Sequence, residues 1–452
     1  MTRALEANLS LRAQEAKAEA RAQLPLQASP AFLPSVSLGL QGLKTTDPVA
    51  VFGLKLRQEN FAQEDLALDA LNRPDAYSGY NATASVQMPL LAPEGLFGFQ
   101  AARKAAEAEE AGARRAAGAT RFFTVQAYTG AILAARRVHA LDAALEAVRG
   151  HVTQAEAMRD QGLVTGLDAR MAGLRASEIE VQRLAAEAEA RNALSALKAI
   201  LDLPESTVLV LDQDLATMDF VSACAPASNE MEPGMDAGTN QGRDEEMGQG
   251  TATSSVLPDA GQGVASEQTC SWDHRGDLQA YDAGVEAASK GVKKAWASQL
   301  PSLAAFGALG HYAQDAPFSD GSGDWTVGIG LSWSPVRGLA GVGAIRAARA
   351  EEASVKAQRG AAFRQAEVEV LQAQRMLEAA REGAGVAARA ASEAQVALEQ
   401  ARARYRTGTA PITELLDVQA ASTRATLSEL AARRDLILAH AALDLAYGVF
   451  DR

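Results

Sequence analysis

The amino-acid sequence repeats itself, and this duplication restricts the chain to folds built from two similar halves. A shift of 267 residues places Leu33-Pro34-Ser35 on Leu300-Pro301-Ser302 without any gap. A second shift, of 246 residues, places Gly162 on Gly408. Each half therefore has the same order of parts: a helix, the Leu-Pro-Ser tripeptide, two strands, a long helix, a glycine turn and a second helix.

Two long stretches without proline predict helices of unusual length. They run from Glu94 to Leu203 and from Val336 to Ala410, and both are rich in alanine, the strongest helix former. Apolar residues in the first stretch recur at the 3–4 spacing of a coiled-coil stripe: Phe122, Val125, Ile132, Val138, Leu141, Leu145 and Val148. Each long helix should extend roughly 100 Å at about 1.5 Å per residue. With the helices that return after the glycine turns, the expected ranges are 94–160, 167–201, 339–405 and 412–447.

Each half also contains one short β region, recognised by the alternation of apolar and polar residues. The clearest run is 325–333, in which every odd position is large and apolar and every even position is Thr, Gly or Ser. Pro89 and Pro335 should end the second strand of each half. Loops rich in Gly, Asp and Pro should connect the strands over 45–76 and 314–324. The expected strands are 35–41, 80–88, 302–312 and 325–333.

A segment of contrasting composition separates the two halves. Residues 220–273 are rich in Gly, Ser, Asp, Glu and Met and lack helical periodicity, so we expect a linker on the outside of the helices. The first repeat should then cover 1–219, with a short strand at 207–211, and the second repeat 274–452. The only two cysteines, Cys224 and Cys270, bracket the linker. In an oxidising compartment they would either close it as a disulfide or stay separate.

Charge and motif content exclude several classes of function. The formal net charge is −13, from 43 basic and 56 acidic residues, and the chain has no Lys/Arg-rich run, which argues against a nucleic-acid partner. The five histidines lack metal-ligand spacing. Met231, Met235 and Met247 have the soft sulfur that Cu(I) prefers, but linker composition explains them better. Since no nucleophilic triad or phosphate-binding loop stands out, we expect neither an enzyme nor a cofactor or metal site.

The four predicted strands point to a membrane barrel that is shared among subunits. The chain has no run of about 18 consecutive apolar residues, so a transmembrane helix is not expected. A closed membrane barrel needs about eight strands or more, which four strands with one apolar face can supply only jointly with other copies. Trp325 and Trp333 share one face and lie roughly 26 Å apart at about 3.3 Å per residue. This distance is close to the height of an outer-membrane apolar band, so both should mark its borders.

Three motifs carry a resemblance to a known family. They are the duplicated Leu-Pro-Ser strand starts, the strand end Trp333-Ser334-Pro335, and the closing motif Tyr-Arg-Thr-Gly-Thr-Ala-Pro-Ile-Thr-Glu-Leu-Leu-Asp over 405–417. With them, nearly the whole chain outside 220–273 resembles the TolC-like outer-membrane efflux proteins. The resemblance implies a mainly α homotrimer, with an α-barrel of helical hairpins in the periplasm and a shared twelve-stranded β-barrel in outer-membrane lipid. It implies a passive exit duct for efflux or type I secretion, working with a periplasmic adaptor and an inner-membrane pump.

The resemblance also implies roles for residues near the glycine turns. Glu414 and Asp417 fall where the family carries its periplasmic acidic constriction. They are three residues apart and share a helix face, and rings of such carboxylates would select cations and respond to pH. Tyr405 and Asp168 match the family's latch, whereas Ala410 replaces its basic latch residue, so that salt bridge should be missing. The adaptor would contact the turns at Gly162, Leu163, Val164, Gly408 and Thr409.

Two alternatives stay open at the level of sequence. A soluble coiled-coil scaffold, whose short strands merely cap a bundle, would purify without detergent. A periplasmic adaptor also has long helical hairpins, but it should contain far more strand than four segments. Residues 1–22 form an amphipathic segment without the apolar core of a signal peptide. This fits a cytosolic chain or, with the resemblance, a sequence that begins after a signal has been removed.

Overall fold

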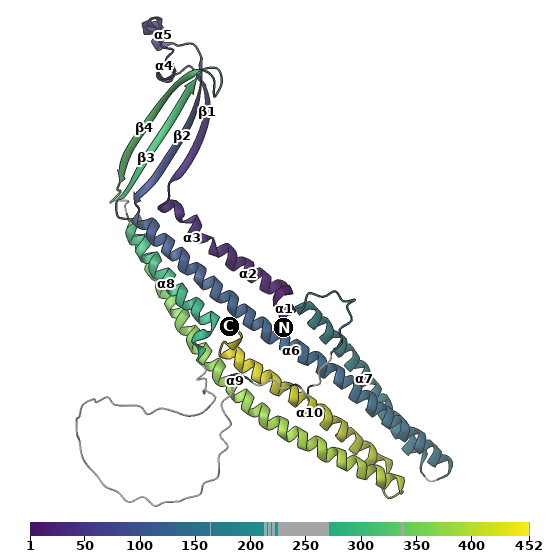
Figure 1. The fold of residues 1–452 in the computed structure, drawn as a ribbon. Coiled ribbons are helices and arrows are strands. Elements are labelled where there is room, and N and C mark those ends of the chain that lie inside the picture. Colours follow the sequence, from purple (N-terminus) through teal and green to yellow (C-terminus); the bar gives the residue numbers. More distant parts are fainter. Residues whose placement is uncertain are drawn as a thin grey trace, which may run out of the picture.

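The computed structural model describes residues 1–162, 164–211, 215, 218, 222–224, 271–335 and 339–451. These residues form a bundle of long helices and one four-stranded sheet, which extends from one end of the bundle (Figure 1). None of the helices in these ranges combines the length and the apolarity that a membrane span requires.

Four helices form two hairpins that reach away from the sheet. Helix α6 spans Pro93–Asp160 and α9 spans Ala340–Arg406, so each is about 100 Å long. Helices α7, Gly166–Ile200, and α10, Ile412–Ala446, fold back along them. The predicted ranges are confirmed to within one residue at every end. Pro93 in the first turn of α6, Pro411 before α10 and the glycines of the two turns define several of these ends locally.

The shorter helices complete the duplicated pattern. Helices α1, α2 and α3, over Thr2–Ala7, Leu9–Ala22 and Leu24–Gln27, run along α6. Helix α8, Gly276–Ala297, packs between α6 and α9 in the second half. The following strands begin at Ser35 and Ser302, which are 267 residues apart, and α7 and α10 match at a shift of 246. The structure therefore confirms the duplication.

The apolar stripe predicted on the first long helix lies in the core. Five of its residues are buried, namely Val125, Ile132, Leu141, Leu145 and Val148. The other two, Phe122 and Val138, are partly buried and pack against the buried clusters. Near the turns, the largest cluster joins all four long helices, and many of its members are alanines. Small side chains allow the helices to approach closely along their whole length.

The sheet has the antiparallel order β1-β2-β3-β4. Its strands are Ser35–Thr45, Tyr77–Leu91, Ser302–Ala313 and Gly321–Ser332, so the four predicted strands are confirmed and each is longer than expected or shifted at one end. The prediction that Pro89 ends its strand is wrong. Strand β2 continues to Leu91, with a register shift between Pro89 and Leu91, because the missing proline N–H interrupts the pairing only locally.

Two further expectations are corrected. The connection over 45–76 is not a plain loop, since it contains α4 (Pro48–Arg57), the 3-10 turn η2 (Gln63–Leu66) and α5 (Leu68–Asn72). The side chain of Asp47 caps α4 by accepting a hydrogen bond from the Val49 N–H at 3.2 Å. Residues 207–211 form no strand, and none of the four described strands pairs with them.

The linker between the halves stays a prediction. Most of 220–273 lies outside the described residues, and so does Cys270. The disulfide between Cys224 and Cys270 therefore stays untested. A short 3-10 turn, η3, covers Trp272–His274 at the end of the linker, and another, η4, covers Val449–Asp451.

Candidate functional site

The register of the sheet gives it one apolar and one polar face. One row across all four strands joins Leu38, Ala84, Leu309 and Trp325, and the exposed fractions of Leu38 and Trp325 are 82% and 73%. The neighbouring row on the other face joins Ser37, Ser85, Ala308 and Thr326, with the Ser37 and Ser85 hydroxyl oxygens 2.6 Å apart. An outward apolar face and an inward polar face are what a water-filled membrane barrel requires.

Among the described residues of the single chain, the sheet is open at both edges. Strands β1 and β4 each pair on one side only, so each carries a row of backbone N–H and C=O groups without a strand partner. The two predicted border tryptophans are both exposed. Trp325 lies within β4, and Trp333 follows its end, where the indole Nε1 donates a hydrogen bond to the Gln299 carbonyl at 3.1 Å. Trp333 therefore lies at the junction of sheet and helices.

The two glycine turns lie at the end of the molecule farthest from the sheet (Figure 1). Gly162 and Gly408 have φ of +73° and +72°, a backbone conformation that glycine adopts without steric cost. Their N–H groups donate to the carbonyls of Arg159 and Tyr405 at 2.8 and 3.0 Å. Val164 and Thr409 follow them in the turns, whereas Leu163 lies outside the described residues.

The two predicted gate carboxylates differ in their surroundings. Glu414 lies in the first turn of α10, and the Arg404 guanidinium at the end of α9 forms an ion pair with it. Asp417 is exposed on the next turn. Ala410, which stands at the place of the family's basic latch residue, is buried and brings no charge. Arg404 is therefore a basic residue of the turn region that the sequence analysis missed.

The predicted latch residues do not hydrogen-bond to each other in the single chain. Asp168 accepts hydrogen bonds from the Thr165 N–H at 2.9 Å and from the Thr165 hydroxyl at 2.7 Å, which caps the start of α7. Tyr405 is buried, and its hydroxyl has no hydrogen-bond partner among the described residues. Burial raises the pKa of Tyr405, and the negative charge of Asp168 raises this pKa further. The latch itself stays a prediction.

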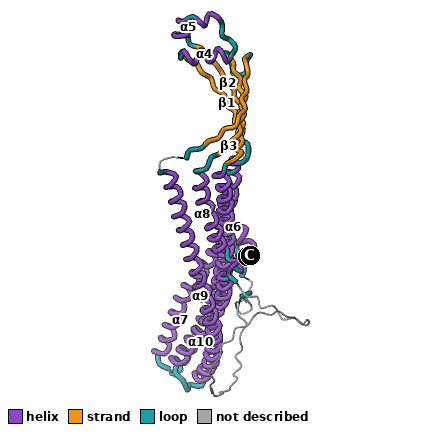
Figure 2. The backbone as a smooth tube through the Cα atoms, turned by 90° about the vertical axis from the view of Figure 1, so that its left-hand side faces the viewer, coloured by secondary structure: helices purple, strands orange, loops and turns teal. Residues whose placement is uncertain are grey.

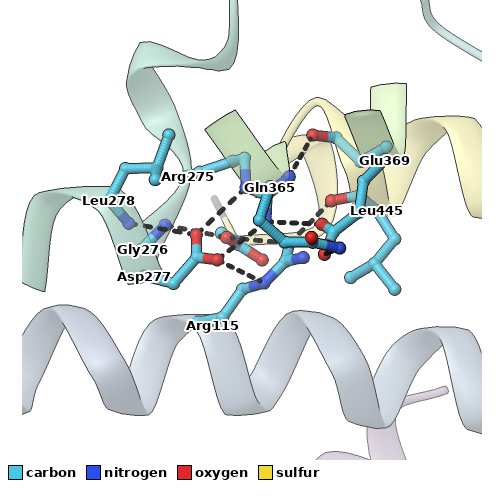
Figure 3. A network of polar contacts seen from close by, with 10 residues as sticks. Arg115, Arg275, Gly276, Asp277, Leu278, Gln365, Glu369 and Leu445 are labelled. Carbon is cyan, nitrogen blue, oxygen red and sulfur yellow. Dashed lines mark hydrogen bonds and ion pairs between the residues drawn. The ribbon is translucent and has the colours of Figure 1, made fainter. Parts of the chain in front are cut away.

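A polar junction that the sequence analysis missed holds the two halves together midway along the bundle (Figure 3). Arg275, just before α8, donates to Asp277 and to Glu369 of α9 at 2.7 and 2.8 Å. Arg115 of α6 donates to the Leu445 carbonyl of α10 at 2.6 Å. The contacts of Arg275 with Glu369 and of Arg115 with Leu445 join residues that are more than 90 positions apart, so no local sequence pattern predicts them.

The C-terminal end of the chain belongs to this junction. The Asp451 carboxylate accepts a hydrogen bond from the Gly276 N–H at 2.8 Å and faces Arg115 at 3.5 Å. Burial raises the pKa of Asp451, although the bond from Gly276 and the charge of Arg115 act in the opposite direction. The junction is therefore a structural one that fixes α6, α8, α9 and α10 against each other.

A second buried cluster fixes the beginning of the linker to α10. The Ser222 N–H donates to His440 Nδ1 at 3.1 Å, and the Ala223 N–H donates to Asp444 Oδ1 at 3.1 Å. The Ser222 hydroxyl also donates to Asp444. Burial raises the pKa of Asp444 and lowers that of His440, and Arg381 lowers the pKa of His440 further.

Comparisons with known proteins agree with this geometry. Residues 272–449 match the sequence profile of a family described as "Outer membrane efflux protein". No curated protein matches the sequence. Among solved structures, the outer-membrane channel OprN superposes with a TM-score of 0.75 at 20% identity, covering 100% of this chain and 89% of that one.

Two further structures have the same fold. The CmeC outer membrane channel of Campylobacter jejuni has a TM-score of 0.75 at 15% identity, covering 99% of this chain and 84% of that one. The open state of the Neisseria gonorrhoeae MtrE outer membrane channel has a TM-score of 0.73 at 18% identity, covering 99% and 87%. At these identities the structural similarity shows the fold. The family profile is separate evidence, from the sequence of the second half of the chain. Residues 272–449 are therefore similar in sequence to the outer membrane efflux proteins, and the chain as a whole has the fold of these outer-membrane channels.

Proposed function

We propose that three copies of this chain assemble into an outer-membrane channel-tunnel, a passive exit duct for exported solutes. The observation that carries the proposal is the sheet with one apolar face, one polar face and two open edges. Pairing β1 of one copy with β4 of the next would satisfy both edges and close a barrel of twelve strands. The long hairpins would then continue the pore into the periplasm over about 100 Å.

The exposed apolar face separates this proposal from a soluble coiled-coil scaffold. A scaffold would leave the row from Leu38 to Trp325 as a large apolar patch in water, which soluble monomers avoid. In a barrel the same row faces lipid.

A matched pair of variants tests the barrel. Leu38→Arg places a charge on the lipid face, which costs about 2–4 kcal/mol near the membrane midplane. Ser37→Arg places the same charge one residue earlier, on the polar face. We expect Leu38→Arg to lose trimers from the outer-membrane fraction and Ser37→Arg to retain them. Equal retention of both, or wild-type protein that is monomeric and soluble without detergent, would refute the proposal.

The acidic side chains near the tip are proposed to gate the duct. In a trimer, Glu414 and Asp417 would form two rings of three carboxylates, whose side chains would narrow the tip and whose charges would select cations. Replacing both by alanine should raise ion conductance in planar bilayers and weaken cation preference. Unchanged conductance and preference would remove the gate assignment while leaving the barrel proposal intact.

The glycine turns are proposed to dock a periplasmic adaptor, itself bound to an inner-membrane pump. The position of the turns supports this docking. They lie at the tips of the two hairpins and contain Gly162, Val164, Gly408 and Thr409. A photo-crosslinking residue at Thr409 should capture a co-expressed adaptor, whereas one at the exposed Arg191 on α7 should not. Capture at both positions, or at neither, would contradict docking at the turns.

A further inference from the structure

The connection between β1 and β2 departs from the duplication that governs the rest of the chain. It carries α4, η2 and α5 over 46–76, whereas the equivalent connection between β3 and β4 covers only 314–320. Figure 2 shows α4 and α5 at the end of the sheet that lies away from the long helices. In the proposed channel this end is the extracellular mouth.

Helix α4 packs against the polar face of the sheet. Asn81, Tyr312 and Ser322 are paired across β2, β3 and β4 and form one row. This row lies on the polar face of the sheet. Arg57 donates to the Tyr312 hydroxyl at 3.2 Å, and its carbonyl accepts from the Ser322 hydroxyl. The Tyr77 hydroxyl donates to Gln58 Oε1 at 2.7 Å.

The glycine at position 79 confirms which face α4 covers. A Cβ built at Gly79, which points to the same face as Asn81, would meet Leu54 of α4 at 2.9 Å. Helix α4 therefore lies on the pore side of the rim, opposite to the face that carries Trp325.

Helix α4 has a second apolar stripe that is largely exposed in the single chain, although its Phe52 ring packs edge-to-face on Phe61 with 5.0 Å between the ring centroids. Its inner side consists of Val51, Leu54 and Gln58, which are buried or half-buried against the strands. Val49, Phe52 and Leu56 repeat the same i, i+3, i+7 spacing on the outer side, with exposed fractions of 79%, 38% and 49%. Since α4 lies on the pore side, this stripe is directed away from lipid.

The dimensions of the barrel identify what can cover this stripe. Twelve strands about 4.8 Å apart and tilted by about 40° close a barrel about 24 Å across. A helix with its side chains is about 10–12 Å thick, so a helix on the wall reaches close to the axis. Three symmetry-related copies of α4 would meet there.

We propose that α4 is an extracellular cap, in which Val49, Phe52 and Leu56 of the three copies pack together around the threefold axis and narrow the outer mouth. This inference rests on the trimeric channel proposed above. The partner of the stripe is the same stripe of a second copy, because an apolar surface buried against its own symmetry mates needs no other ligand.

Crosslinking in the intact trimer tests the packing. A photo-crosslinking residue at Leu56 should link protomers on a denaturing gel, and the same residue at Val86, on the lipid face of β2, should not. Absence of linked protomers at Leu56 in a protein that migrates as a trimer would overturn the cap alone. A protein that forms no trimer would overturn the channel proposal and the cap together.

Conductance tests the narrowing. The double variant Val49→Ala/Leu56→Ala removes two side chains that are exposed in the single chain, so it should fold normally and raise the single-channel conductance in planar bilayers. The matched change Val86→Ala should leave the conductance unchanged. Conductance of the double variant equal to that of wild type would overturn the constriction even if protomers crosslink.

Discussion

The Arg404 guanidinium forms an ion pair with Glu414 across the Gly408 turn, joining the last turn of α9 to the first turn of α10. One of the two carboxylates proposed for the gate is therefore balanced within its own chain. Asp417, one turn further along α10, is exposed and takes part in no ion pair among the described residues. The two carboxylates should therefore contribute unequally to ion selection.

We expect Asp417→Asn to reduce cation preference more than Glu414→Gln does, because the charge of Glu414 is already balanced by Arg404. Arg404→Gln should increase cation preference by freeing Glu414, with little change in stability, since exposed ion pairs contribute about 1 kcal/mol or less. Reversal potentials under a salt gradient measure both effects. Equal losses for Asp417→Asn and Glu414→Gln would show that the pairing has no influence on the pore.

Substitutions of Tyr405 distinguish the packing of its ring from a hydrogen bond of its hydroxyl. Its ring is buried while its hydroxyl lacks a partner, so Tyr405→Phe should leave the free energy of unfolding unchanged or raise it by about 1 kcal/mol. Tyr405→Ala should cost about 3 kcal/mol by opening a cavity. If the hydroxyl latches to Asp168 in the assembled trimer, Tyr405→Phe should also increase the open probability of the channel. Wild-type gating of Tyr405→Phe would mean that the ring acts through packing alone.

The contact between His440 and Ser222 should weaken in acid. Because Nδ1 accepts the Ser222 N–H, the ring must be neutral there, and burial lowers the pKa of His440 below its usual 6.5. The stability that this contact contributes is complete above pH 6.5 and is lost as the pH falls through the lowered pKa. Burial raises the pKa of neighbouring Asp444, so its contribution is complete below pH 3.8 and is lost as the pH rises.

Hydrogen exchange of the Ser222 amide, corrected for the intrinsic rate at each pH, measures this effect. Protection should fall as the pH drops below 6.5 in the wild-type protein. In His440→Gln, whose amide oxygen accepts a hydrogen bond but does not titrate, protection should stay level over the same range. A wild-type protein with constant protection would contradict the assigned role of the neutral imidazole.

Two glycines of α6 should respond oppositely to alanine. A Cβ at Gly118 would collide with the buried Asp451 carboxylate, so Gly118→Ala should cost about 1–3 kcal/mol of unfolding free energy. Gly130 has nothing within 4 Å of the same atom, so Gly130→Ala should gain up to about 1 kcal/mol of helix propensity. Thermal unfolding in detergent compares the two variants. Stabilisation by Gly118→Ala would show that Asp451 does not pack against α6.

Two helix starts carry a short-range sequence pattern. The Thr165-x-x-Asp168 spacing is that of a capping box, and it indicates that Asp168 caps α7. Asp47 followed by Pro48 is likewise a helix start, in a stretch that was expected to be a plain loop. Both patterns involve residues at most three positions apart, so the sequence alone is sufficient to predict them.

The sequence by itself determined the duplicated order of elements, the ends of the four long helices and the alternation of the four strands. These features depend on residues close together in the chain: absent prolines, glycines with positive φ and a period of two. Only the tertiary structure decided that Arg404 pairs with Glu414, that Arg275 and Arg115 join the two halves, and that α4 packs on the polar face of the sheet. Such contacts depend on how long helices and strands pack against each other, and a local pattern carries no information about that packing.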